Sequence, residues 1–441
     1  MKTSNILLKI LRKHSQTHGN RAAYRFQDSR SDTLETCTYF ELDQISDSIA
    51  NCLSDSFKVG SSIALLGLSD KQNICAFLGA LKAGMIVAVT PSTHSKNQSL
   101  TNYREIIQVD GFIVDQSTYN CCYNNHTTTN FVYNIEDLSR ELSHFQLRDY
   151  PDEAIAYRQF TSSTTHAIRS ISINHKELHH WLEFSAKLQG GMFESSSLFW
   201  APLSHSIGLY YGMFLPLFSG GDAIRLRIDR LWQNAVSMLN YISSANVGVA
   251  GGPISLLKLA INQAHSNQYN AEHNLSLDFS ALNSLILCGE SVDTNHVLQI
   301  NKFFTNRTFK GEITDLYVSA ECPAGVQAFE LDSRNEQRCS TSTNPHLQSK
   351  FVTENSAPIK PLSIYSNGEL YINKQYIAAS AQSLLSVLKE SMRPNEPSVP
   401  DDYLPICEHV EVSNYGIRHV SSPTKTSNVD QANTENSFAP P

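Results

Sequence analysis

The segment from residue 63 to residue 89 leaves this chain few ways to fold. Residues 63–68 are apolar throughout, and 74–84 form an apolar helical pattern that ends at a glycine. A second apolar run, 85–89, follows directly and stops before Pro91. Strand, helix and strand at this spacing predict a βαβ unit, because parallel strands need a crossover connection. Strands without polar alternation also predict a sheet that helices cover on both faces.

The rest of the chain alternates the same two kinds of segment. The apolar start, residues 6–13, predicts an amphipathic helix that packs on the core, and a second amphipathic helix is expected from residue 38. Further strands are predicted at 22–26, 112–115, 247–253, 285–287 and 313–316, and further helices at 178–188, 231–242, 254–264 and 295–304. Residues 121–130, which begin with Cys121 and Cys122, are predicted to form a polar loop. The pattern as a whole predicts an α/β protein with parallel sheets.

Charge and cysteine content exclude several classes of function. The 441 residues carry 34 basic and 42 acidic side chains, a net charge of −8, without a run of Lys or Arg. We therefore expect no nucleic-acid partner. Residues 6–13 are too short an apolar run for a membrane span, and they lack the small-residue cleavage site of a secretory leader. Nine cysteines without a C-x-x-C pair then predict reduced thiols and a cytoplasmic protein.

A run of hydroxyl side chains extends from Thr161 to Thr165, and Arg169 stands four positions further on. Apolar alternation at Ile171 and Ile173 predicts a strand after this run. A hydroxyl-rich loop between two strands, with a cation at its exit, can hold a phosphate through O–H, N–H and charge-assisted contacts. A Ser/Thr-rich hairpin turn without a ligand is the alternative that these residues alone leave open.

A second informative stretch, residues 198–221, contains His205. A strand is predicted to end at Pro202, and His205 begins an apolar helix in which glycines recur. A histidine at this position either lines a site or is a core histidine next to a helix N-terminus. These residues alone fit both interpretations.

Taken in order, these stretches resemble the adenylate-forming acyl-activating superfamily, the AMP-dependent synthetases and ligases. Residues 159–178 resemble its phosphate loop and the helix start that follows it. The Trp-x-Pro-Leu-x-His stretch around His205 is most similar to the fatty acyl-AMP ligase branch, and residues 317–321 are similar to the motif Tyr-Gly-x-Thr/Ala-Glu. The resemblance implies the large N-terminal domain of that family, a multi-layer α/β/α/β/α fold with parallel sheets and a β-rich end.

The resemblance also implies the domain boundaries. We expect an AMP-binding, acyl-adenylate-forming large domain over residues 1–375 and a degenerate end of that domain over 376–420. Residues 421–441, rich in Ser, Thr, Asn and Pro, are expected to form a disordered tail. The family's mobile C-terminal domain, which supplies a catalytic lysine, is not expected here.

The resemblance assigns residues to an ATP and acyl site. His205 would border and gate the acyl pocket, and the Gly-Gly-Pro turn at 251–253 would line the acyl tunnel. Glu321 would act in catalysis and hold Mg²⁺, Tyr317 would stack on the adenine of ATP or AMP, and Glu408 would bind the ribose. The other nucleotide contacts that the motifs imply are Thr161, Ser162, Thr164, Thr165, Arg169, Gly289, Glu290 and Ser319.

The chain departs from the family pattern in its phosphate loop. Ser163, His166 and Ser170 stand where the family has glycines, and Arg169 stands where it has lysine. Side chains at glycine positions narrow such a loop and restrict its backbone. We therefore expect activation of a carboxylic or fatty acid with ATP to acyl-AMP, with impaired or partner-dependent activity. The alternative is a non-catalytic pseudoenzyme that binds an acyl chain, an acyl carrier protein or a partner synthetase.

Overall fold

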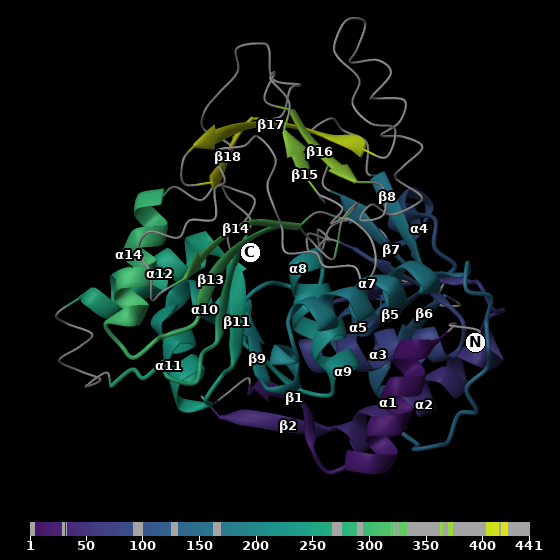
Figure 1. Cartoon of the computed structure of the whole chain (residues 1–441). Coiled ribbons are helices and arrows are strands. Elements are labelled where there is room, and N and C mark those ends of the chain that lie inside the picture. Colours follow the sequence, from purple (N-terminus) through teal and green to yellow (C-terminus); the bar gives the residue numbers. More distant parts are fainter. Residues whose placement is uncertain are drawn as a thin grey trace, which may run out of the picture. The chain divides into compact units, whose positions relative to one another are not determined.

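The computed structural model of the chain folds into two compact units. It describes residues 5–28, 31, 33–90, 100–124, 131–161, 169–266, 276–288, 294–318, 320, 323, 326–332, 362–364, 369–373, 403–413 and 416–421. The first unit contains the described residues up to Glu194 together with Pro202–Arg225, and the second contains Ser195–Ala201 and the described residues from Leu226 on (Figure 1). The boundaries predicted after residues 375 and 420 stay predictions.

A six-stranded sheet forms the centre of the first unit. Its strands are β3 (Ser62–Leu66), β4 (Ile86–Val89), β5 (Gly111–Val114), β6 (Val132–Asn134), β7 (Ile155–Thr161) and β8 (Arg169–Asn174). They are arranged in the order β6-β5-β3-β4-β7-β8, and all neighbours are parallel except the antiparallel pair β7 and β8. Helix α3 (Asp70–Lys82) connects β3 to β4. The predicted βαβ unit and its parallel sheet are therefore confirmed.

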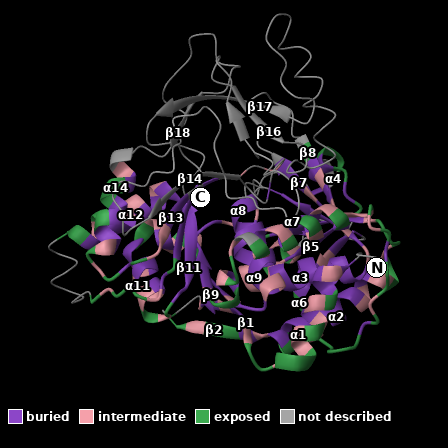
Figure 2. Cartoon of the chain, in the orientation of Figure 1, coloured by how far each residue is buried: buried purple, intermediate pink, exposed green. Residues whose placement is uncertain are grey.

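Apolar side chains cover both faces of this sheet. On one face, Phe112 and Phe160 belong to a buried cluster with Tyr103 of helix α4 (Leu100–Ile107). On the other face, the ring of Tyr157 lies 6.1 Å from Phe77 of α3 and 5.7 Å from Phe214. Figure 2 shows the buried strands of this sheet between partly exposed helices. Cover on both faces explains why residues 63–68 lack polar alternation.

Three helices of the first unit begin with a capping box, in which two side chains and two backbone N–H groups pair reciprocally. Thr38 caps α2 (Tyr39–Ser56), Ser69 caps α3, and Asn174 caps α7 (His175–Leu188). Each cap satisfies backbone donors that a helix start otherwise leaves unpaired. The starts of these helices are thus set by local sequence.

Among the remaining elements of the first unit, some were predicted from the sequence and others were missed. Helix α1 (Ile6–His18) buries Leu7, Leu8 and Leu11, as its amphipathic pattern predicts. Strand β1 (Ala22–Gln27) pairs in parallel with β10 (Asp222–Arg225) and antiparallel with β2 (Leu34–Thr38), two strands that the sequence analysis missed. A short helix, α6 (Ile135–Leu138), follows β6.

The polar loop predicted from Cys121 is wrong in its first part. Residues Gln116–Asn124 form helix α5, in which Cys121 is exposed and Cys122 is buried. Neighbouring residues of a helix point about 100° apart around its axis, so one cysteine faces the core and the other faces solvent. Residues 125–130 lie outside the described part of the chain.

The second unit has a parallel sheet and a separate antiparallel sheet. The strands of the first are β9 (Ser196–Phe199), β11 (Val249–Pro253), β12 (Ser284–Cys288), β13 (Glu312–Tyr317) and β14 (Val326–Asp332). They follow the order β14-β13-β12-β11-β9, and only β14 is antiparallel to its neighbour. The antiparallel sheet consists of β15 (Leu362–Ile364), β16 (Glu369–Asn373), β17 (Tyr403–Ser413) and β18 (Gly416–Ser421).

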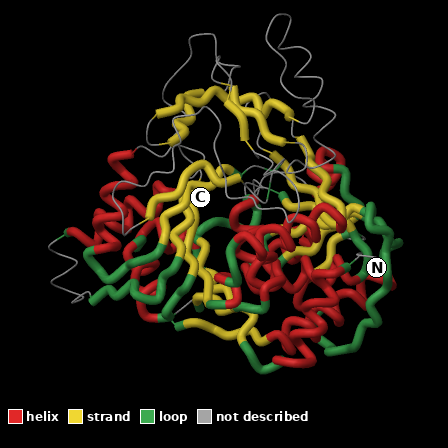
Figure 3. The backbone as a smooth tube through the Cα atoms, viewed as in Figure 1, coloured by secondary structure: helices red, strands yellow, loops and turns green. Residues whose placement is uncertain are grey.

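Helices α10 (Ile228–Gln233), α11 (Val236–Ser244), α12 (Ile254–His265) and α14 (Thr294–Thr305) belong to the same unit (Figure 3). The single helix predicted at 231–242 is two helices, because the backbone leaves the helical region at Asn234, with φ −138° and ψ 72°. None of the helices in the described ranges is long and apolar enough to cross a membrane.

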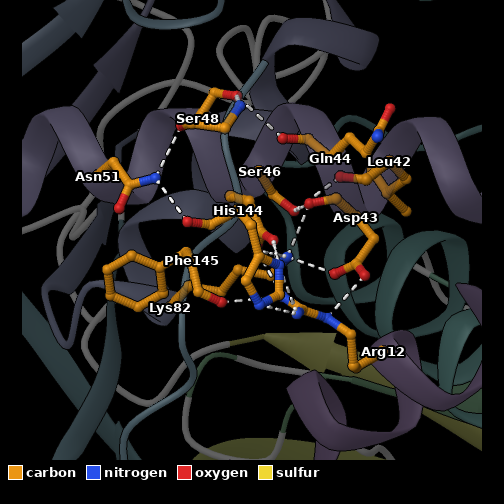
Figure 4. Close-up of polar contacts among 12 residues, drawn as sticks. Arg12, Leu42, Asp43, Gln44, Ser46, Ser48, Asn51, Lys82, His144 and Phe145 are labelled. Carbon is orange, nitrogen blue, oxygen red and sulfur yellow. Dashed lines mark hydrogen bonds and ion pairs between the residues drawn. The ribbon is translucent and has the colours of Figure 1, made fainter.

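A cluster of buried charges ties α1, α2 and α3 together (Figure 4). Lys82 of α3 has a fully buried side chain, and its Nζ lies 2.5 Å from Asp43 Oδ1 and 2.7 Å from Asp47 Oδ1, both on α2. Lys82 also donates to the backbone oxygen of Asp43 at 2.9 Å. Arg12 of α1 pairs with the same carboxylates at 2.7 Å and 2.6 Å, and the exposed His144 lies 3.2 Å from Asp47. Two acidic and two basic side chains thus balance in charge where water is largely excluded.

We predict that Lys82→Met lowers the free energy of unfolding by about 3–5 kcal/mol, because two buried carboxylates then share one cation. Urea unfolding followed by circular dichroism measures the change. The matched control is Lys71→Met, which removes an ion pair between Lys71 and Glu35 that is much more open to solvent. That change is expected to cost at most about 1 kcal/mol. Equal losses in the two variants would contradict the role given to the buried cluster.

Candidate functional site

The structure describes five of the site residues implied by the sequence. Thr161 ends β7, Arg169 begins β8, Tyr317 ends β13 and Glu408 lies within β17, and for these four only the backbone is described. His205 is described together with its side chain. The predicted site residues that lie outside the described ranges are Ser162, Thr164, Thr165, Gly289, Glu290, Ser319 and Glu321.

The hydroxyl-rich stretch joins two neighbouring antiparallel strands. In the register of β7 and β8, Thr161 stands directly opposite Arg169. The chain therefore leaves the sheet at Thr161 and enters it again beside that position at Arg169, which confirms a strand on each side of the hydroxyl run. Because β3, β4, β5 and β7 are parallel, Thr161 lies at the edge of the sheet where their carboxyl ends meet. Open α/β sheets bind their ligands at that edge.

His205 occupies the N-cap position of a helical stretch in three parts. Helix α8 (Ser206–Leu209) continues into the π-helix Tyr210–Phe214 and then into α9 (Leu215–Ser219). The backbone oxygen of His205 accepts from the N–H of Leu209 at 2.9 Å, and its own N–H donates to Pro202 at 3.0 Å. The helix start predicted at His205 is confirmed, with His205 as the N-cap. The strand predicted to end at Pro202 ends earlier, at Phe199. The π-helix was not predicted.

The π-helix is held from a distant part of the first unit. The hydroxyl of Tyr24, on β1, donates to the backbone oxygen of Met213 at 2.8 Å. The hydroxyl of Tyr210 lies 3.0 Å from Ser185 Oγ of α7. Both contacts are buried, so the widened turn has partners outside the helix for polar groups on its surface.

The side chain of His205 is exposed, yet the surrounding protein removes enough hydration to lower its pKa below the ordinary value. The imidazole is therefore neutral at pH 7, with one ring nitrogen as donor and the other as acceptor. A neutral ring suits the neighbourhood of an apolar acyl chain better than an imidazolium, which would have to be desolvated there.

One buried side chain links this helix start to the end of β7. Gln159 is 3% exposed. Its Nε2 donates to the backbone oxygen of Ser204 at 3.1 Å, and its Oε1 accepts from the hydroxyl of Ser206 at 3.0 Å. The residues before and after His205 are thus bonded to a residue two positions before Thr161. The sequence analysis gave Gln159 no role. The signal that could have drawn attention to it is an amide side chain on the same face of the strand as the buried Tyr157.

Two glycines predicted to line an acyl tunnel are closely packed by neighbours in the second unit. A Cβ on Gly251 would lie 2.6 Å from the Phe199 ring, and a Cβ on Gly252 would lie 2.7 Å from the Trp200 ring. Gly252 has φ +150°, a conformation that other residues rarely adopt. The indole N–H of Trp200 donates to the backbone oxygen of Pro253 at 2.9 Å. Both glycines therefore have a packing role beside Phe199 and Trp200, and their part in a tunnel stays a prediction.

His175 begins the helix after the hairpin and is 8% exposed. Its N–H donates to the backbone oxygen of Ala154 at 3.0 Å. Burial lowers the pKa of His175 to about 4, although the nearby charge of Asp152 acts in the opposite direction. The ring is therefore neutral at pH 7 in the folded protein, and protonation below that pH favours the unfolded chain.

We predict that the free energy of unfolding falls as the pH is lowered from about 6.5 to about 4, by about 3 kcal/mol for His175 alone. The sign follows because the unfolded histidine binds a proton in this window while the folded one does not. Urea unfolding at several pH values measures the slope for the wild type, for His175→Gln and for the control His180→Gln, at an exposed position of the same helix. Titration of the Asp and Glu side chains contributes to the pH dependence of the free energy of unfolding in all three proteins alike. A slope in His175→Gln as steep as in the control would refute the assignment.

We predict that Gly252→Ala is more destabilising than Gly60→Ala by about 1–3 kcal/mol, the ordinary cost of overpacking. Gly60 also has a positive φ, +88°, but nothing lies within 4 Å of an added Cβ there, so it reports backbone strain with little collision. Denaturant unfolding of the two variants gives the difference. If both cost the same, Trp200 gives way freely and the packing role of Gly252 fails.

The sequence also matches a known family model. Residues 11–380 match the model of the AMP-binding enzymes, which is most of the chain. The match covers the β7–β8 hairpin, the His205 turn and the parallel strands of both units.

Curated relatives are 20–26% identical to this chain over the aligned residues. The 4-hydroxyphenylalkanoate adenylyltransferase of Mycobacterium tuberculosis is 22% identical over 306 residues, which cover 65% of this chain and 48% of that protein. The medium-chain-fatty-acid–acyl-carrier-protein ligase JamA of Moorena producens is 23% identical over 287 residues, which cover 62% of this chain and 48% of JamA. The chain therefore spans about half the length of these relatives.

Solved structures share the fold. The fatty acid AMP ligase from Legionella pneumophila superposes with a TM-score of 0.70 at 18% identity, covering 95% of this chain and 77% of that chain. The adenylation domain of a keto acid-selecting NRPS module, bound to keto acyl adenylate, gives a TM-score of 0.74 at 14% identity, with 95% and 82% covered. The α/β fold with parallel sheets and a β-rich end, predicted from the motifs, is confirmed.

Proposed function

Since the chain belongs to the family of AMP-binding enzymes, we propose that it activates a carboxylic acid with ATP. In this reaction a carboxylate oxygen attacks the α-phosphorus of ATP, and the bond from that phosphorus to the pyrophosphate oxygen breaks. The products are an acyl-adenylate and pyrophosphate. The names of the matched relatives, an adenylyltransferase and a fatty-acid ligase, support this reaction class.

The observation that carries the proposal is the contact between two motifs that lie more than forty residues apart in the sequence. The strand that leads into the hydroxyl-rich run is bonded through Gln159 to the turn that carries His205. The strand end that leads into the proposed phosphate-binding residues and a neutral imidazole thus belong to one small region of the first unit. Such a region suits a substrate in which a phosphate is joined to an acyl group.

Each predicted site residue has a part in this proposal. Hydroxyl and backbone groups of the hairpin connection, with the guanidinium of Arg169, would hold the phosphates and offset the charge that grows on them. The ring of Tyr317 would stack on the adenine, and His205 would border the acyl chain. Further nucleotide contacts would come from Thr161, Ser162, Thr164, Thr165, Gly289, Glu290, Ser319 and Glu408.

A magnesium ion fits the proposed reaction through the chemistry of its donor. Glu321 would hold Mg²⁺ by a carboxylate, the ligand that this cation prefers beside nucleotide phosphates. The described ranges contain no group of three or more His, Cys, Asp or Glu side chains that could hold a metal ion on their own. A cation held by one carboxylate and the substrate phosphates is consistent with that donor set. When bound, it would neutralise negative charge on the phosphates.

The substrate class proposed is a medium- or long-chain fatty acid, with an aromatic acid as the variant that the adenylyltransferase relative suggests. An acyl carrier protein is the proposed acceptor, because JamA is named as a ligase to such a carrier. The proposed activity is low in the isolated chain. Ser163 and His166 stand at glycine positions of the family's phosphate loop between β7 and β8, and Ser170 stands at a third such position, the second residue of β8. Their side chains would restrict the backbone that approaches the phosphates.

We predict acid-dependent exchange of labelled pyrophosphate into ATP, at a rate well below about 1 per second. The assay uses purified protein with a panel of medium-chain, long-chain and aromatic acids. Arg169→Ala is expected to slow the exchange by about a hundred-fold or more, because a preorganised positive charge is lost. Arg140→Ala, at an exposed position of the same unit, is the control that should keep the wild-type rate.

Two results would change this proposal. Exchange near 1 per second would mean that side chains at the glycine positions do not hinder the phosphates. If no acid supports exchange while AMP or an acyl chain still binds in calorimetry, the chain is a non-catalytic binding protein.

A further inference from the structure

We propose that Gln159 is a positioning residue that fixes His205 relative to the end of β7 at Thr161, so that an acyl-adenylate bound at that strand end meets the imidazole in one geometry. The inference rests on the proposed function for the identity of the ligand. The positioning itself rests on the contacts of Gln159 alone.

The register of β7 determines where Gln159 points. Side chains alternate along a strand, so Gln159 shares a face with Tyr157, while Phe160 belongs to the cluster on the opposite face. The Tyr157 ring packs against Phe214, the last residue of the π-helix. The face that carries Gln159 is therefore the face on which the helical stretch after His205 lies.

The hydrogen bonds allow one orientation of the amide. The backbone oxygen of Ser204 can only accept, so the nitrogen of Gln159 must face it, at 3.1 Å. The amide oxygen then faces Ser206, whose hydroxyl must donate, at 3.0 Å. Both ends of the side chain are satisfied at once in a buried place. A shift of the turn along the strand would leave a carbonyl, a hydroxyl or the amide unpaired, at about 1–3 kcal/mol for each group.

The two directional hydrogen bonds of Gln159 fix the position of the turn along β7, which the neighbouring aromatic contacts cannot do. Packed rings such as those of Tyr157 and Phe214, which are tilted by 46° to each other, tolerate sliding and other tilts, because dispersion attraction has little directionality. The amide bonds both neighbours of His205 and leaves the imidazole itself outside the contact. Gln159 is also two residues before Thr161, which stands opposite Arg169. One side chain therefore sets the distance between the start of the connection and the histidine.

The test compares variants of Gln159, Ser206 and Ser185 by two measurements. Gln159→Met keeps the length of the side chain and removes both hydrogen bonds, and Ser206→Ala removes one. The control Ser185→Ala, on α7, removes a buried contact with the hydroxyl of Tyr210, which belongs to the helical stretch after His205. The first measurement is the titration of His205 by NMR, assigned with His205→Gln. The second is calorimetric binding of dodecanoyl sulfamoyl adenosine, a stable analogue of an acyl-adenylate.

We expect Gln159→Met to raise the pKa of His205 toward its ordinary value, because water hydrates the ring when the turn is loosened. The same variant should bind the analogue roughly ten- to a hundred-fold more weakly. Ser206→Ala should change the pKa of His205 and the affinity for the analogue in the same directions and by less. Ser206→Thr keeps the hydroxyl and should have nearly the wild-type pKa and affinity. Ser185→Ala should change neither. If Gln159→Met does not fold, the Ser206 pair carries the test.

The outcomes separate the inference from the proposed function. An unchanged His205 titration in folded Gln159→Met or Ser206→Ala overturns the positioning role. A changed titration in a protein whose wild type does not bind the analogue supports the positioning of His205 and overturns the proposed ligand. Equal effects in Ser185→Ala and Ser206→Ala would mean general loosening of the helix, and would also overturn the inference.

Discussion

A lysine that is completely removed from water is the constraint on which the first unit depends. The bare charge would cost several kcal/mol even after relaxation, so Lys82 is compatible with folding only where Asp43 and Asp47 reach it. The carboxylates come from α2 and the second cation, Arg12, comes from α1, so three helices must meet at one point. The same helix α3 presents Phe77 to Tyr157 and Phe214. By fixing α3, the buried charges therefore also help to position the helical stretch that begins at His205.

The candidate site arises where this helix layer meets the end of one strand. Strand β7 receives apolar packing on both faces, and its last residues lead into the hydroxyl-rich connection. Polar recognition within that apolar setting is carried by the single amide of Gln159, which is satisfied by partners on one turn. Apolar packing brings the helical stretch after His205 onto β7. The hydrogen bonds of Gln159 fix the position of that stretch along the strand.

The sequence predicts what depends on neighbouring residues. Apolar runs of strand and helix length predicted β3, α3 and β4, and the motif around Pro202 predicted the helix start at His205. The helix α5 was missed, because polar and cysteine residues gave no apolar period, although Cys122 is buried. The role of Gln159 was missed for a different reason. Its partners lie 45 and 47 residues away, and no local pattern reports a contact between segments so distant.

The π-helix has a consequence for how this chain tolerates change in length. A π turn contains one residue more than an α turn, and one residue corresponds to about 100° around a helix axis. Deleting a residue between Tyr210 and Phe214 would restore an unbroken α-helix and keep its apolar character. It would also rotate everything before the deletion, so that the Ser204 carbonyl and the Ser206 hydroxyl would turn away from β7. The direction in which His205 faces around the helix axis therefore depends on the number of residues between it and α9.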